Sequence, residues 1–98
     1  MVDETTLSKF MDAMDYCGKS IEELRKAAVI EVKGVKYTIL GTNEIPTLNE
    51  LEVDFYANEA KSAFKLFDAD SLKEEMDKFK SYWEERMRRT IELCLKLM

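Results

Sequence analysis

The stretch VIEVKGVKYTIL, residues 29–40, decides the fold because it pairs with itself in a single register. With a two-residue turn at Lys33-Gly34, the cross-strand pairs on one face are all apolar: Val32–Val35, Ile30–Tyr37 and Ala28–Ile39. Glu31 then lies opposite Lys36 on the other face, and a slip of one residue would mix the two sets. The sequence therefore predicts an antiparallel β-hairpin. Because an isolated hairpin is barely stable in water, its apolar face must lie against helices.

Upstream of the hairpin, the spacing of apolar residues predicts two helices. The first covers about 4–17 and ends at Gly18, where a left-handed backbone is least costly. Its apolar stripe consists of Leu7, Phe10, Met11 and Met14. The second covers about 20–28 and starts at a capping box, in which Ser20 and Glu23 each satisfy the other's free backbone N–H. Both helices therefore offer an apolar face to the hairpin.

The chain after the hairpin reads as a loop over 41–46 and then a helix over about 47–67. Thr47 and Glu50 form another capping box at its start. Its apolar residues keep rough helical spacing: Leu48, Leu51, Phe55, Ala60, Ala63, Phe64 and Phe67. Residues 51–56, however, alternate apolar and polar side chains in the way a strand does. A third strand there, followed by a helix from about 58, is the alternative.

The last segment, 71–98, is the longest helix, capped by Asp70 or Ser71 with Glu74. Its stripe has spacings of three and four: Leu72, Met76, Phe79, Trp83, Met87, Thr90, Cys94 and Met98. The helix would be about 40 Å long, more than the roughly 26 Å diameter of a 100-residue globule. It either protrudes or packs on a second copy. The expected fold is a small α+β single domain over 1–98, mainly helical, in the order α-α-β-β-α-α.

The inventory of reactive side chains excludes several classes of chemistry. The 98 residues contain no histidine and two cysteines, Cys17 and Cys94, so Ser-His or Cys-His catalysis and zinc motifs are excluded. The cysteines indicate free thiols in a reducing compartment, with one long-range disulfide as the alternative. Residues 1–30 lack the apolar core of a signal peptide, and no run approaches the roughly 20 apolar residues of a membrane helix. We expect a cytoplasmic protein, in the host cytoplasm if it is viral, that does not bind membranes.

One apparent calcium motif fails on inspection. AFKLFDAD at 63–70 resembles the opening of an EF-hand loop, with Asp68 and Asp70 as its first ligands. Lys73 stands where the loop needs glycine, and Phe79 where it needs a bidentate glutamate. There is also no phosphate-binding glycine loop and no GxSxG, and the spacing of the carboxylates shows no convergent pair. We therefore expect no enzyme activity, no metal and no cofactor.

Acidic side chains are concentrated in one part of the chain. Residues 42–70 hold seven acidic and two basic side chains, a net charge of −5, equal to that of the whole protein. No lysine or arginine occurs between Lys36 and Lys61. The candidate face consists of Glu44, Glu50, Glu52, Asp54 and Glu59. This face is either an ordinary solubilising surface or a surface that docks on a basic protein partner.

The end of the last helix is unusually apolar. Residues 91–98 are apolar nearly all round, with Glu92 and Lys96 as the polar strip, whereas an amphipathic helix needs about a third of its surface apolar. Burial in the monomer core would explain this, and so would contact with a second copy or another protein. The candidate interface residues are Trp83, Met87, Ile91, Leu93, Cys94 and Leu97.

Direct nucleic-acid binding is not expected, because Arg86, Arg88 and Arg89 lie beside Glu84 and Glu85 and are largely neutralised. The leading expectation is a non-enzymatic protein-interaction module. In its sharper form it is an acidic inhibitor that covers the basic surface of a nucleic-acid-handling host protein, by analogy with small viral proteins that disable host nucleases. The alternative is a homodimeric structural or assembly factor joined through the last helix.

Overall fold

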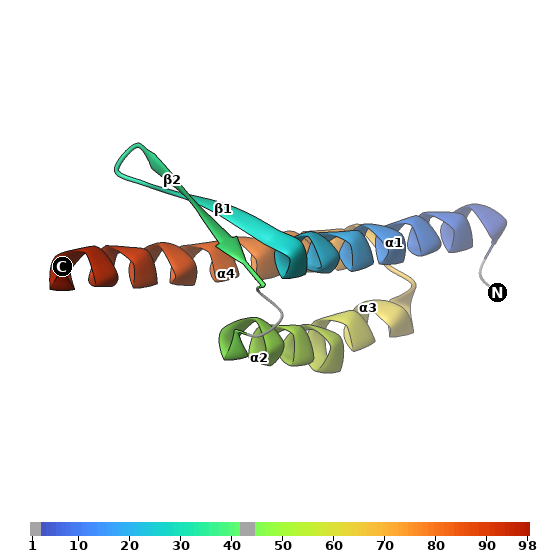
Figure 1. The fold of residues 1–98 in the computed structure, drawn as a ribbon. Coiled ribbons are helices and arrows are strands. Elements are labelled where there is room, and N and C mark those ends of the chain that lie inside the picture. The colour runs from blue at the N-terminus through green and yellow to red at the C-terminus, as the bar shows by residue number, and fades with distance from the viewer. Residues whose placement is uncertain (1–2, 42–44) are drawn as a thin grey trace.

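The computed structural model of the chain describes residues 3–41 and 45–98. It is mostly helical, with one two-stranded antiparallel hairpin and a long C-terminal helix, and so confirms the predicted small α+β domain (Figure 1). The elements in chain order are α1 (Glu4–Lys26), β1 (Ala27–Val32), β2 (Val35–Leu40), α2 (Pro46–Asp54), the π-helical segment η2 (Phe55–Ala60), α3 (Lys61–Leu66) and α4 (Ala69–Leu97).

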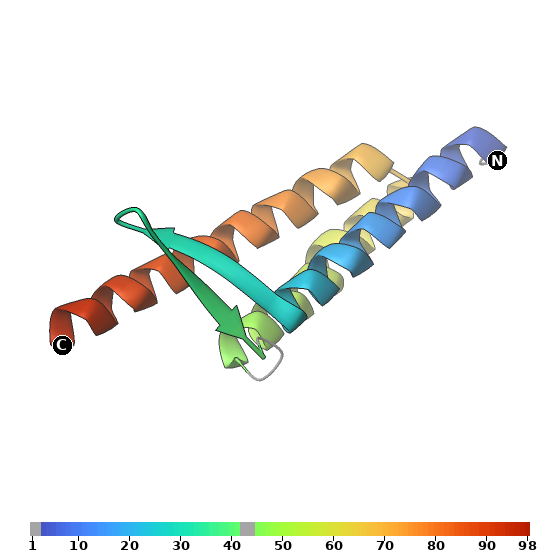
Figure 2. The ribbon, with the colours of Figure 1, turned by 45° about the horizontal axis from the view of Figure 1, so that its top comes forward.

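α1 and α4 form a parallel pair of helices, and α2, η2 and α3 together form a rod that packs along this pair. α1 and α4 lie side by side and run in the same direction, while α2, η2 and α3 run back along them (Figures 1 and 2). Tyr16 Oη donates a hydrogen bond to Asp77 Oδ1 at 2.6 Å, which joins the exposed edges of α1 and α4. The hairpin crosses the second half of α4, where Arg88 Nε donates to the carbonyl of Glu31 at 3.4 Å. The molecule is therefore elongated, with extents of 59 × 22 × 20 Å.

The hairpin has the predicted register. Ala28 pairs with Ile39, Ile30 with Tyr37, Glu31 with Lys36 and Val32 with Val35. Lys33 and Gly34 have φ values of 52° and 79°, and a two-residue turn with both φ values positive matches the twist of the strands. The apolar face of β1 is buried on the helices, whereas Val35 of β2 is 52% exposed. β1 thus packs into the core, whereas β2 lies at the edge of the molecule.

A single helix replaces the two predicted before the hairpin. α1 continues through Gly18 to Lys26, so the predicted stop at Gly18 and the Ser20–Glu23 capping box are both wrong. Its buried side is made of Phe10, Ala13, Cys17, Ser20, Ile21 and Leu24, while Leu7, Met11 and Met14 are exposed. A helical glycine costs about 1 kcal/mol relative to alanine. The buried stripe runs on both sides of Gly18, and its burial outweighs that penalty.

Residues 46–66 are helical throughout, so the alternative strand at 51–56 is wrong. Leu51 and Phe55 lie one turn apart and face the core, and Val53 between them points to solvent. The helix starts with Pro46 in its first turn after Ile45, without a side-chain cap, so the predicted Thr47–Glu50 box does not form. Half of the predicted loop over 41–46, residues 42–44, lies outside the described residues, and Pro46 belongs to α2.

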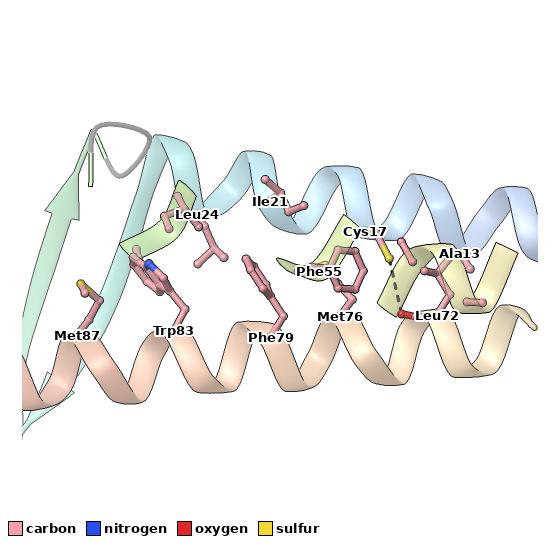
Figure 3. Packing of buried hydrophobic residues seen from close by; sticks show 14 of the residues in the cluster. Ala13, Cys17, Ile21, Leu24, Phe55, Leu72, Met76, Phe79, Trp83 and Met87 are labelled. Atoms are coloured by element: carbon pink, nitrogen blue, oxygen red, sulfur yellow. Dashed lines mark hydrogen bonds between the residues drawn. The ribbon is translucent and has the colours of Figure 1, made fainter. Parts of the chain in front are cut away.

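The core is a row of buried side chains between α1 and α4 (Figure 3). α2 and η2 cover the side that these two helices leave open. α4 begins after Asp68, whose carboxylate accepts from Ser71 N at 3.0 Å, instead of after Asp70 or Ser71. The first five residues of the predicted α4 stripe are buried: Leu72, Met76, Phe79, Trp83 and Met87. The last three, Thr90, Cys94 and Met98, are exposed. The end of α4 therefore protrudes from the packed body.

Candidate functional site

Three exposed carboxylates gather on the rod. Glu50 and Asp54 lie one turn apart on α2, and Glu59 follows on η2. No ion pair joins them to a basic side chain of the described residues. Glu44 of the predicted face lies outside the described residues. We call Glu50, Asp54 and Glu59 the acidic surface.

Glu52 differs from its acidic neighbours because it points inward. Its carboxylate binds Arg25 at the end of α1, and its side chain is only 17% exposed. The Nε of Arg25 is buried and has no acceptor among the described residues, so Glu52 is the anion that balances this guanidinium. The structure therefore assigns Glu52 to the scaffold, where it holds α2 against α1, and away from the acidic surface.

A groove of about 410 Å³ runs beside the acidic surface, between α2–η2 and α4. Asp54 and Glu59 line it on one side, and Glu75 and Lys78 line it on the other. Its apolar lining comes from Leu51, Phe55, Phe79 and Tyr82. The Lys78 ammonium lies 3.0 Å from Glu75 Oε1, and this hydrogen bond is the main reason that the pKa of Lys78 is raised. The groove thus combines aromatic rings with two unpaired carboxylates.

Sequence reasoning did not find the far side of this groove. Glu75, Lys78 and Tyr82 lie on α4, more than fifteen positions beyond Glu59, and they are ordinary solvent-facing positions of a helix. They join the acidic surface only because the rod packs antiparallel to α4 (Figure 2). No local pattern in the sequence indicates that packing.

The predicted interface on the last helix divides into two parts. Trp83 and Met87 are buried in the core of the chain itself and are not available to a partner. Ile91 is half-buried against that core. The remaining candidates are exposed: Leu93 is 58% and Leu97 80% accessible, and Cys94 lies with them. The explanation that residues 91–98 are apolar because they lie in the core therefore fails for most of them.

Both cysteines are free thiols, and the structure separates them sharply. The Cys17 thiol is buried between α1 and α4, where Sγ donates to the carbonyl of Leu72 at 3.8 Å (Figure 3). Burial, with a smaller contribution from nearby Asp77, raises the pKa of Cys17 to about 11. Since the thiolate is the reactive form, Cys17 is protected and Cys94 is the thiol open to solvent.

The three arginines of α4 each contact another side chain of the same helix. Arg88 Nη1 and Arg89 Nε lie 2.8 and 3.2 Å from the two oxygens of Glu85. The Arg86 guanidinium carbon lies 5.9 Å from the centre of the Tyr82 ring. The single carboxylate of Glu85 therefore serves two arginines, and the contact of Arg86 with the Tyr82 ring leaves its charge in place.

Within residues 3–41 and 45–98, no group of three or more His, Cys, Asp or Glu side chains could hold a metal ion. No helix in those ranges is both long and apolar enough to cross a membrane. No family model, no curated protein and no solved structure matches the chain.

Proposed function

We propose that the protein is a non-enzymatic interaction module whose acidic surface docks on a basic surface of another protein. The observation that carries the proposal is the cluster of exposed, unpaired carboxylates Glu50, Asp54 and Glu59 beside an aromatic-lined groove. An ordinary solubilising face needs no adjoining groove. Protein interfaces, by contrast, commonly combine aromatic side chains with a polar rim.

The two parts of this surface would act at different stages of binding. The carboxylates attract a basic partner from a distance, which raises the association rate and makes it depend on salt. Tyr82, 55% exposed at the edge of the groove, offers apolar contact once the surfaces meet. A lysine or arginine of the partner would fit this arrangement, because its aliphatic stem covers aromatic carbon while its charged end reaches Asp54 or Glu59.

A basic surface on a protein commonly serves to hold nucleic acid, and a bound acidic module would cover it. We therefore propose an inhibitor of a nucleic-acid-handling protein, acting by occlusion. On this proposal the module and the nucleic acid compete for one site, and the partner cannot hold both.

The test compares the chain with a charge-reversed variant. Wild type and the double variant Glu50→Lys with Asp54→Lys are immobilised at equal density and used to capture proteins from one lysate. Basic proteins retained by wild type should be lost by the variant, and the Kd of a purified partner should rise tenfold or more, about 1.4 kcal/mol. A nucleic-acid-binding partner should release its DNA or RNA as wild type is added.

The matched control is Asp12→Lys with Glu23→Lys, which makes the same change of net charge at two exposed positions of α1. Its capture profile should equal that of wild type. If the acidic-surface variant captures the same basic proteins with the same affinity, docking does not use this surface. If both doubles lose binding equally, only net charge matters and the proposal fails.

A further inference from the structure

The buried stripe of α4 continues beyond the body that buries it. From Leu72 to Met87, residues at spacings of three and four are covered by α1, β1 and the rod. The same spacing leads to Ile91, Cys94 and Met98, so these lie on the same side of the helix. Arg88 bonds to the carbonyl of Glu31, Ile91 is half-buried against the core, and the end of α4 then runs on past the hairpin (Figures 1 and 2). The exposed apolar side chains of this end are Cys94 and Met98, which continue the buried stripe, and Leu93 and Leu97 on the adjoining face of the helix. We call these four residues the C-terminal stripe.

The chain exposes more surface than a compact monomer of its mass. Its accessible surface is 6888 Å², whereas a folded monomer of 11.4 kDa is expected to expose about 5,800 Å². The surplus of about 1,100 Å² is close to the roughly 800 Å² that each partner contributes to a stable interface of standard size. One further contact of standard size would therefore remove most of the surplus surface of this elongated molecule.

Charge indicates which occupant the C-terminal stripe fits. In a two-fold dimer the same patch meets itself, so a patch with strong net charge repels its own copy. Residues 84–98 hold four basic and three acidic side chains, and Glu85 binds two of the arginines. The acidic surface, with unpaired carboxylates only, would repel itself. The end of α4 is both nearly neutral and apolar, so a second copy meets less electrostatic repulsion there than at the acidic surface.

We propose that the C-terminal stripe packs on the C-terminal stripe of a second copy of the chain, in a two-fold contact that makes a dimer. The contact covers Leu93, Cys94 and Leu97, and it leaves the acidic surface of each copy free. This inference does not depend on the proposed docking function, because it uses an apolar, nearly neutral segment of α4 that lies beyond the groove.

The test is the mass of the reduced protein in solution, measured by sedimentation equilibrium over a range of concentrations. Wild type should approach twice 11.4 kDa at tens of micromolar. Leu93→Glu with Leu97→Glu places two charges in the contact, and its mass should stay at that of one chain. The matched control is Val53→Glu with Leu66→Glu, which alters side chains 64% and 78% exposed on α2 and α3, against 58% and 80% for the tested pair. The control should dimerise as wild type does.

A second measurement uses the thiol in the stripe. A short bis-maleimide cross-linker reacts with the exposed Cys94 and spares the buried Cys17, so wild type should give a covalent dimer and Cys94→Ser should give none. A wild type that remains monomeric at about 200 µM overturns the proposal. So does a tail variant that keeps the doubled mass, or a control variant that loses it. The charge-reversed acidic-surface variant should keep the doubled mass, which separates this test from that of the docking function.

Discussion

The ion pair between Arg25 and Glu52 joins the end of α1 to the rod, and both side chains are partly buried. The side chains of Arg25 and Glu52 are 37% and 17% exposed. A charge half removed from water depends on its counter-ion more than a fully hydrated one does. The exposed pair of Asp15 and Lys19, at 64% and 75%, shows the contrast, because both partners keep their water.

We therefore expect Glu52→Ala to destabilise the fold by about 1–3 kcal/mol, since it leaves the Arg25 guanidinium without its anion. Asp15→Ala should change stability by less than about 0.5 kcal/mol. The measurement is the free energy of unfolding by urea, followed by circular dichroism. Equal losses for the two variants would show that Glu52 has no special role in holding the rod.

At this scale the sequence is a poor guide to which acid faces outward. Glu50, Glu52 and Asp54 look alike as a series of carboxylates between apolar residues. Their difference comes from Arg25, which lies 27 positions before Glu52 and reaches it only when the rod packs on the end of α1. The residues of the acidic surface could be named from sequence, but their separation from the scaffold acid could not.

Among the elements, α1 is a continuous helix although its sequence contains Gly18, which predicts a helix end. Gly18 lies in the exposed face of an unbroken helix, and a Cβ added there would meet no atom within 4 Å. Gly34 also has open space, but its φ of +79° is a conformation that residues with a side chain rarely adopt. A side chain should therefore be tolerated at Gly18 and strained at Gly34.

Gly18→Ala should stabilise the protein by about 0.5–1 kcal/mol, because it removes the backbone entropy of a helical glycine without a clash. Gly34→Ala should instead destabilise it by about 1 kcal/mol through strain in the turn. Thermal unfolding midpoints of the two variants should therefore move in opposite directions. A lower midpoint for Gly18→Ala would indicate that the helix is bent or broken at that point.

The hairpin gives a test within one cross-strand pair. Val32 is 2% exposed and its partner Val35 is 52% exposed. Val32→Asp should cost at least about 2 kcal/mol, because it buries a carboxylate without a partner. Val35→Asp should cost much less, since the new charge stays in water. Similar unfolding free energies for the two variants would mean that the hairpin does not press β1 into the core.

How well an element could be predicted depends on how local its determinants are. The hairpin register depends on residues that face each other across a two-residue turn, and the sequence predicts every pair. The break at Gly18 was wrong because a local preference of about 1 kcal/mol is smaller than the burial of a continuous stripe. The strand at 51–56 was a false alternative for a related reason: Leu51 and Phe55 fit a helical face as well as a strand face.

At the scale of the whole molecule, the length of the last helix could be predicted from the sequence, but the packing of the rod on α4 could not. The long last helix could be expected to exceed the width of the body, and its end does protrude. The groove could not be expected, because its two walls come from α2–η2 and from α4 and meet only through the antiparallel packing of the rod. The sequence therefore predicts only half of the candidate site. It identifies the acidic residues of one wall, but not Glu75 and Tyr82 of the other.

The parallel alignment of α1 and α4 has a consequence for how the chain folds. Tyr16 and Asp77 are 61 positions apart, and Cys17 and Leu72 are 55 apart, whereas the strands of the hairpin are joined by two residues. Contacts between distant residues form slowly because a long loop must close first. During synthesis the hairpin can therefore close early, while the apolar side of α1 lacks its main partner until α4 has emerged from the ribosome. We expect the newly made first half to be the aggregation-prone stage in the life of this protein.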